Sequence, residues 1–126
     1  MEEADILVRR TLEIAAALGN PPLFIENPWT GELKNRELLG HLQMYVVDYC
    51  KYGMPYRKRT AIWTNSEWFP AQRLCQHNCW ASVGRRHIAR AQQGPPGPRF
   101  TQEQLYMVPD ALCDEIAEWC TEFYGV

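Results

Sequence analysis

The sequence lacks the features that would assign it to several common classes of protein. No apolar run approaches the roughly 20 residues that a membrane-spanning helix needs. The five cysteines are an odd number, which argues against a closed disulfide framework and predicts a reducing intracellular compartment, nucleus or cytoplasm. The first residues are acidic, unlike those of a secretory signal. What is present is a chain of 126 residues with 46% hydrophobic content, enough for one folded domain with a core.

Charge is distributed unevenly along the chain. The formal net charge is only −2, but residues 51–99 contain nine bases and one acid, whereas residues 100–126 contain six acids and no base. A basic middle between acidic ends predicts a local positive surface, which suits a nucleic-acid partner. No Gly-x-Gly occurs, so the sequence offers no glycine loop that would follow a strand and hold a nucleotide or S-adenosylmethionine.

Hydrophobic periodicity predicts an α/β arrangement, with helices at residues 3–18 and 109–123. In the first helix the apolar side chains at helical spacing are Ile6, Leu7, Ile14 and Leu18. Short apolar runs typical of strands occupy residues 23–25, 45–50 and 60–64. The connector between the second and third strands is too short for a parallel crossover, so these two strands are predicted to pair antiparallel. Glycine and proline at residues 93–99 predict a linker.

A polar cluster, Glu26-Asn27-Pro28, follows the first predicted strand. Ligands bind at the C-terminal ends of strands in open α/β sheets. A carboxyl group with a raised pKa at such a place can hold or protonate the ring nitrogen of a heterocycle. Glu26 and Asn27 are therefore candidate catalytic residues. The alternative is a turn that ends the strand with a solvated glutamate.

A basic cluster lies between the second and third predicted strands. Arg57, Lys58 and Arg59 are consecutive bases that suit phosphate contacts, and a neighbouring aromatic ring such as that of Tyr56 can stack on a base or a ribose. These four residues are candidate nucleic-acid contacts. The alternative is a solvated basic hairpin.

The order of these motifs carries a resemblance to a known family. The strand with Glu-Asn-Pro, the helix after it and the segment Val-Asp-Tyr-Cys-x-Tyr-Gly-x-Pro-Tyr-Arg-Lys-Arg-Thr-x-Ile-Trp-Thr-Asn resemble the middle of DNA cytosine-5 methyltransferases. The resemblance is closer to a divergent branch of methylase-like proteins in large viruses, phages and some algae, and covers residues 3–65. It implies that Glu26 contacts a flipped cytosine. It also implies that Arg57 and Arg59 take the arginine roles of the second motif, if the arginines rather than Pro55 set the register.

The sequence departs from the pattern of this family at several points. Pro28 stands where the family has valine, and Tyr56 follows Pro55 where the family has glutamine. The family's glycine loop for S-adenosylmethionine and its Pro-Cys nucleophile lie N-terminal to the Glu-Asn motif, but the 25 residues before Glu26 contain neither. We therefore expect a partial unit that does not turn over alone and that depends on a missing N-terminal half or a partner subunit.

Cysteine and histidine gather after the third predicted strand. The spacing of Cys75 and Cys79 is close to that of the paired ligands of a zinc knuckle, and His87 is a third candidate ligand. His77 or Cys50 can close a tetrahedral site. The alternative is a set of buried free thiols beside a surface histidine.

The remaining cysteines and most tryptophans are predicted to be core residues rather than site residues. These are Cys113 and Cys120, on the last predicted helix, and Trp63, Trp68, Trp80 and Trp119. Their spacing alone indicates no further chemistry.

The predicted fold class is α/β. We expect a partial Rossmann-like methyltransferase sheet of three C-terminal strands with an antiparallel pair, an irregular Cys/His-containing extension and a C-terminal helix. The three segments are residues 1–65, 66–99 and 100–126. The predicted function is that of a fragment of a DNA cytosine-5 methyltransferase-like protein that contacts the target base. Two alternatives stay open: a non-enzymatic, zinc-stapled nucleic-acid-binding module, and a remnant that pairs with a cofactor-binding subunit.

Overall fold

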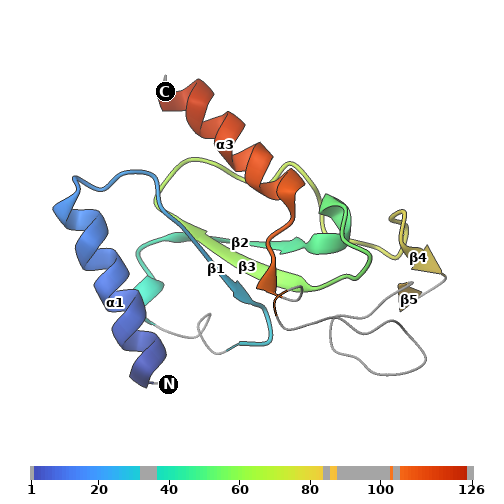
Figure 1. The fold of residues 1–126 in the computed structure, drawn as a ribbon, viewed down its shortest axis with the longest axis horizontal. Coiled ribbons are helices and arrows are strands. Elements are labelled where there is room, and N and C mark those ends of the chain that lie inside the picture. The colour runs from blue at the N-terminus through green and yellow to red at the C-terminus, as the bar shows by residue number, and fades with distance from the viewer. Residues whose placement is uncertain (1, 32–36, 84–85, 88–102, 104–105, 125–126) are drawn as a thin grey trace.

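The computed structural model describes residues 2–31, 37–83, 86–87, 103 and 106–124, and its architecture is α/β, as predicted. The elements are α1 (Glu2–Ala17), β1 (Phe24–Pro28), the short 3-10 helices η2 (Glu37–Leu39) and η3 (Tyr49–Tyr52), β2 (Gln43–Asp48), β3 (Arg59–Thr64), β4 (Ser82–Val83), β5 (Arg86–His87) and α3 (Asp110–Tyr124) (Figure 1). No helix in the described part of the chain is both long and apolar enough to cross a membrane. The predicted linker at residues 93–99 lies outside the described residues.

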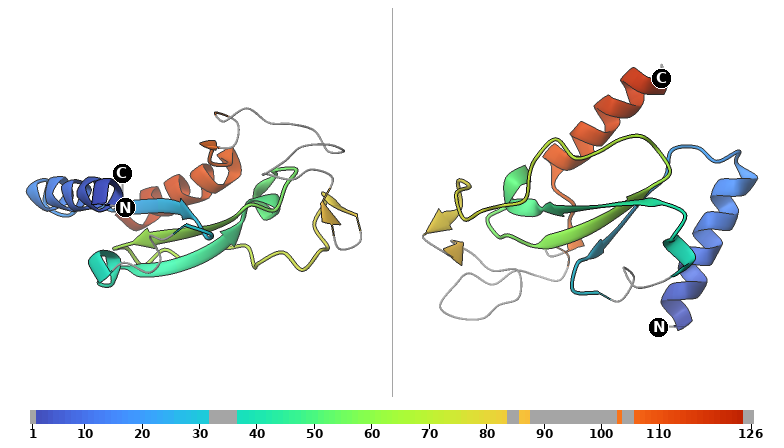
Figure 2. Two further views of the ribbon diagram at one scale, coloured as in Figure 1. Left: turned by 90° about the horizontal axis from the view of Figure 1, so that it is seen from below. Right: turned by 180° about the vertical axis from the view of Figure 1, so that it is seen from behind.

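A three-stranded sheet with the order β1-β3-β2 forms the centre of the fold. Strand β3 runs antiparallel to both neighbours, so the predicted antiparallel pairing of the second and third strands is confirmed. The register pairs Asp48 with Arg59 and Glu26 with Ile62. The short hairpin β4–β5 lies at the η3 end of the sheet and α1 at the other end, and the three views agree on this arrangement (Figures 1 and 2).

Two strands end at residues other than predicted, and both ends concern candidate site residues. Strand β1 continues to Pro28, so Glu26 and Asn27 lie inside a paired strand and not in a turn after it. Strand β2 ends at Asp48, and the next two residues begin η3. Gly53 terminates η3 with a left-handed backbone (φ 96°), a conformation that glycine adopts without a side-chain penalty.

One face of the sheet is covered by α3. Leu112 of α3 packs against Ile62 of β3 and Trp68 in the larger apolar cluster. The ring of Trp68 meets those of Phe24 and Tyr45 edge-on, with centroid distances of 5.7 and 6.0 Å. Glu26 is the direct partner of Ile62 across the strands, so its side chain belongs to this same face.

The opposite face of β3 packs against α1. Val8 of α1 joins Leu39, Ala61 and Trp63 in a smaller cluster. The predicted helix is confirmed, but the apolar side chains that predicted it point outward. These are Ile6, Leu7, Ile14 and Leu18, which are 47% to 70% exposed. Helix α1 therefore contacts the sheet through a narrow stripe that excludes most of its large apolar side chains.

The core prediction holds for some aromatic and thiol side chains and fails for others. Trp63 and Trp68 are buried, as expected. Trp80, which follows the turn at Cys79, is 62% exposed, and Cys113 is exposed on α3. Helical spacing alone did not reveal which side of α3 faces the sheet: Leu112 is buried, and its neighbour in sequence is turned outward.

Candidate functional site

Asp48, the last residue of β2, is a buried carboxylate surrounded by donors. Arg59 donates to both of its oxygens, from Nε at 2.9 Å and from Nη2 at 3.0 Å, and the Cys75 amide donates at 2.8 Å. Arg57 adds an ion pair with an N–O distance of 3.5 Å. Burial alone would raise the pKa of Asp48, but the bonds from Arg59 and Cys75 and the charges of both arginines hold it below its ordinary value. Asp48 is therefore an anionic anchor for the basic loop.

Tyr49, the next residue, holds the candidate catalytic carboxylate. Its hydroxyl donates to Glu26 Oε2 at 3.0 Å. Tyr49 is 1% exposed, whereas Glu26 lies open to solvent. Burial, and then the negative charge of Glu26, raise the pKa of Tyr49, so the phenol remains a protonated donor at neutral pH. The buried tyrosine thus holds one oxygen of the Glu26 carboxylate and leaves the carboxylate accessible to a ligand.

The predicted nucleic-acid contacts on the basic loop differ in their exposure. Tyr56 is 2% exposed, so its ring packs inside the protein and not against a ligand outside it. The side chains of Arg57 and Arg59 are about one third exposed, and both are directed to Asp48. The ammonium group of Lys58 lies 5.7 Å from the centroid of the Tyr49 ring. Part of the positive charge in this loop is thus neutralised within the protein.

Backbone pairing brings the Glu-Asn strand and the basic loop together. The Trp29 amide, one residue beyond β1, donates to the Arg59 carbonyl at 2.9 Å. On the other side of β3, the Tyr49 amide donates to the Lys58 carbonyl at 3.3 Å. Where the basic loop leads into β3, its backbone is therefore hydrogen-bonded to the residue after β1 on one side and to the first residue of η3 on the other. The loop thus lies next to β1, the strand that carries Glu26.

Four predicted metal ligands converge at the η3 end of the sheet. The ligand atoms of Cys50, Cys75, Cys79 and His87 all lie within 4.8 Å of one another. Cys75 Sγ lies 3.6 Å from His87 Nε2. Of the two residues that sequence reasoning left open for the fourth position, the structure brings Cys50 into this cluster. His77 is exposed outside it, and its ring centroid is 6.2 Å from that of His87.

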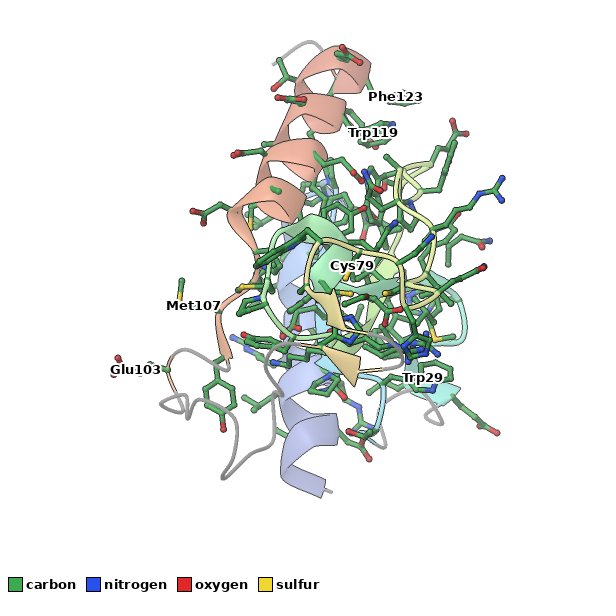
Figure 3. The ribbon with its side chains drawn as sticks, turned by 90° about the vertical axis from the view of Figure 1, so that its right-hand side faces the viewer. Trp29, Cys79, Glu103, Met107, Trp119 and Phe123 are labelled. Carbon is green, nitrogen blue, oxygen red and sulfur yellow. The ribbon has the colours of Figure 1, made fainter. Side chains whose placement is uncertain are left out.

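The thiols of this cluster have unequal acidities. Burial raises the pKa of Cys50 above its usual range. Burial also acts on Cys75, but the His77 amide and the side chains of Cys50, His87 and Cys79 lower its pKa to about 6. His77 has a left-handed backbone (φ 63°), which turns the chain back toward Cys75. Cys79, in the turn before β4, is labelled in Figure 3.

Sequence reasoning missed Asp48 and Tyr49 as site residues. A signal for Asp48 was present: once the second and third strands pair antiparallel across a short connector, an acid at one end faces a base at the other. The observed partner is Arg59. No comparable signal identified Tyr49, because its contact joins η3 to Glu26 of β1, two segments that are distant in the sequence.

The turn after β1 does not form an open glycine loop of the kind that holds S-adenosylmethionine. A site for that cofactor needs an open turn after a strand, and Gly31 is the glycine nearest the end of β1. A Cβ atom at Gly31 would collide with the Asn27 side chain and meet the Pro28 carbonyl, so this turn folds back on its own strand.

Comparison with known proteins shows a similarity to a viral protein. The chain is 38% identical over 123 residues to a probable DNA (cytosine-5)-methyltransferase of Frog virus 3 (isolate Goorha), and the match covers 90% of this chain. It covers 56% of the viral protein, so the chain spans about half the length of this relative. No family model matches the chain, and no solved structure matches it. The similarity confirms the resemblance to viral-type DNA cytosine-5 methyltransferase-like proteins.

Proposed function

We propose, from the chain's place among viral-type DNA cytosine-5 methyltransferase-like proteins, that it supplies the target-base contact and a DNA-contacting loop to such an activity. One observation carries the proposal. The Glu26 carboxylate, held by Tyr49, and the basic loop lie on adjacent segments joined by the bond from the Trp29 amide to the Arg59 carbonyl. The two motifs that the resemblance singles out therefore lie next to each other in the fold.

Glu26 suits recognition of a cytosine edge. Cytosine presents an N4 amino donor beside its N3 acceptor, and a carboxylate accepts from N4 while its acid form donates to N3. Tyr49 engages Oε2 of Glu26 at 3.0 Å and fixes the orientation of the group without burying it. A base must leave the helix to reach such a group, so the proposed substrate is a flipped cytosine.

The basic loop suits contacts with the phosphate backbone. Asp48 holds Arg59 in a two-pronged ion pair, which makes Arg59 a positioning residue for the loop. Lys58 and the half-buried Arg57 lie next to it and are the proposed phosphate contacts. Tyr56, being buried, supports the loop from inside.

The strand order supports the proposed origin of the sheet. Strands β1 and β2 run parallel to each other on either side of the antiparallel β3. We assign β1, β3 and β2 to the three C-terminal strands of a Rossmann-like methyltransferase sheet. Methyl transfer also needs a nucleophile and S-adenosylmethionine, which this chain would receive from a further segment or a partner subunit.

Binding of an unpaired cytosine tests the proposal. Fluorescence anisotropy would compare one duplex carrying a single unpaired cytosine with the same duplex carrying an unpaired thymine. We expect tighter binding of the cytosine duplex, and about a tenfold loss of this preference in Glu26→Gln. Glu67→Gln, at another exposed glutamate, is the matched control and should keep the preference. Equal binding of both duplexes by the unmodified protein would refute the proposed role.

A second function is favoured by the cysteine–histidine cluster. Four convergent metal ligands beside a basic segment are also typical of a zinc-stapled nucleic-acid-binding module without enzymatic activity. Such a module would bind both duplexes equally, with an affinity that falls steeply as salt increases. The same titration therefore separates the two functions.

A further inference from the structure

We propose that Cys50, Cys75, Cys79 and His87 form a structural zinc site, and that this site fixes the Tyr49–Glu26 contact and the basic loop. The site itself stands on geometry alone, whereas its effect on base binding rests on the proposed function. The four residues come from η3, from the segment after β3 and from β5, so a bound ion would join three separate parts of the chain.

The donor set and its geometry fit zinc. Three thiolates and one imidazole are an established tetrahedral set for structural zinc, with bonds of about 2.3 Å to sulfur and about 2.0–2.1 Å to nitrogen. These lengths give ligand-to-ligand distances of about 3.5–3.8 Å in a tetrahedron. The observed distance from Cys75 Sγ to His87 Nε2 is 3.6 Å. Four protein ligands leave no open position, which indicates a structural and not a catalytic ion.

The segment around the cluster has little apolar burial to hold it in place. Between residues 71 and 80, Cys75 is the one buried residue, and the flanking side chains are exposed. The hairpin β4–β5 pairs two residues with two, which is too short to be stable alone. The described cysteines are free thiols, so no disulfide fixes this segment. Metal coordination supplies the missing constraint.

Three consecutive residues connect the cluster to the candidate site. Cys50 is a proposed ligand, Tyr49 donates to Glu26, and Asp48 accepts from the amide of Cys75 as well as from Arg59. An ion bound by Cys50 and Cys75 holds η3, which follows Asp48, against the segment whose Cys75 amide donates to the Asp48 carboxylate. It thereby sets the start of η3, from which the Tyr49 hydroxyl reaches Glu26.

Metal analysis of the purified chain tests the site directly. We expect about one zinc ion per chain by mass spectrometry, and tetrahedral thiolate bands after replacement by cobalt(II). Cys79→Ser and His87→Ala should each lose most of the metal, while His87→Cys should retain it because a thiolate can replace the imidazole. Cys113→Ser and His41→Ala, at an exposed thiol and an exposed imidazole outside the cluster, are the matched controls and should bind as the unmodified protein does.

Two results would overturn the zinc site. One is a folded protein that holds no stoichiometric zinc even after reconstitution under reducing conditions. The other is undiminished zinc in both Cys79→Ser and His87→Ala. Far-ultraviolet circular dichroism of each variant shows whether a loss of metal accompanies a general loss of fold, and His87→Cys keeps the test decisive if the alanine variant does not fold.

The coupling to base binding has its own readout. In His87→Ala, or after chelation of the unmodified protein, the preference for the cytosine duplex should fall while the sheet remains folded. The coupling would be refuted if the unmodified protein contains one zinc ion per chain but keeps its preference for the cytosine duplex after the zinc is removed. That result would not contradict the zinc site itself. If even the zinc-loaded protein shows no cytosine preference, the proposed function fails, and the metal analysis is unaffected.

Discussion

Asp48 and Glu26 are carboxylates on the two outer strands of one sheet, yet the structure surrounds them very differently. Asp48 is buried and receives bonds from Arg59 and from a backbone amide, with Arg57 close by. Glu26 is exposed, and Tyr49 engages one of its two oxygens. The comparison shows that fixed donors, more than position in a strand, decide whether a carboxylate supports the fold or remains available to a ligand.

The largest expected effect is that of Asp48→Asn. Removing the buried charge weakens the bonds from Arg59 and from the Cys75 amide, and because hydrogen bonds to charged groups contribute about 1.5–3 kcal/mol each, we expect a loss of about 3 kcal/mol or more. Urea denaturation would measure the free energy of unfolding. Glu26→Gln is the matched control, and because that side chain is exposed its cost should stay within about 0.5 kcal/mol. Equal costs for the two variants would contradict the division between structural and available carboxylates.

Much of the fold could be predicted because it depends on local patterns. Both long helices, three strands and the antiparallel pairing of β2 with β3 follow from periodicity and from the length of one connector. The end of β1 could not be predicted in the same way, since its ladder continues through Pro28 only because β3 lies beside it. Which side of α1 is buried also depends on the sheet. Val8 is buried, whereas Ile6, an equally apolar side chain on the same helix, is exposed.

The candidate site was predictable as residue types but not as contacts. The spacing of Cys75, Cys79 and His87 suggested a metal cluster, and the structure brings these residues together. The choice of Cys50 over His77 could be made only from the fold, because Cys50 lies in η3, far from the other three ligands in the sequence. The same holds for the two arginines, whose spacing suggests DNA contacts but does not reveal that Asp48 binds both.

A smaller effect should distinguish the two arginines that Asp48 binds. Arg59 makes two bonds, at 2.9 and 3.0 Å, whereas Arg57 approaches one oxygen at 3.5 Å. Arg59→Lys loses the two-pronged geometry and should lower the free energy of unfolding by about 1.5–3 kcal/mol. Arg57→Lys should cost less than about 1 kcal/mol. Thermal or urea unfolding of the pair would measure the difference, and a larger cost at Arg57 would reverse our ranking of these contacts.

A still smaller effect on stability is expected at Tyr49, with a distinct effect on binding. Tyr49→Phe removes the hydroxyl that holds Glu26 and should cost about 0.5–1.5 kcal/mol. Tyr52→Phe is the matched control, since its hydroxyl donates to Glu115 at 3.1 Å, away from Glu26. Both variants should lose similar stability, but Tyr49→Phe alone should weaken the preference for an unpaired cytosine. If Tyr52→Phe weakens it equally, Tyr49 is not a positioning residue for Glu26.

The smallest effect on stability, and the one that best locates the DNA, concerns two lysines. Lys58 lies over the Tyr49 ring, on the side of the site that leads to Glu26, whereas Lys51 lies in η3 beyond Asp48. If DNA approaches from the Glu26 side, Lys58→Met removes one phosphate contact, and the slope of log K against log salt should become shallower by about 0.9. Lys51→Met changes the net charge equally and should leave the slope unchanged. Identical slopes for both variants would mean that the basic loop acts only through its net charge. The Glu26 carboxylate would then lie away from the backbone of the bound DNA.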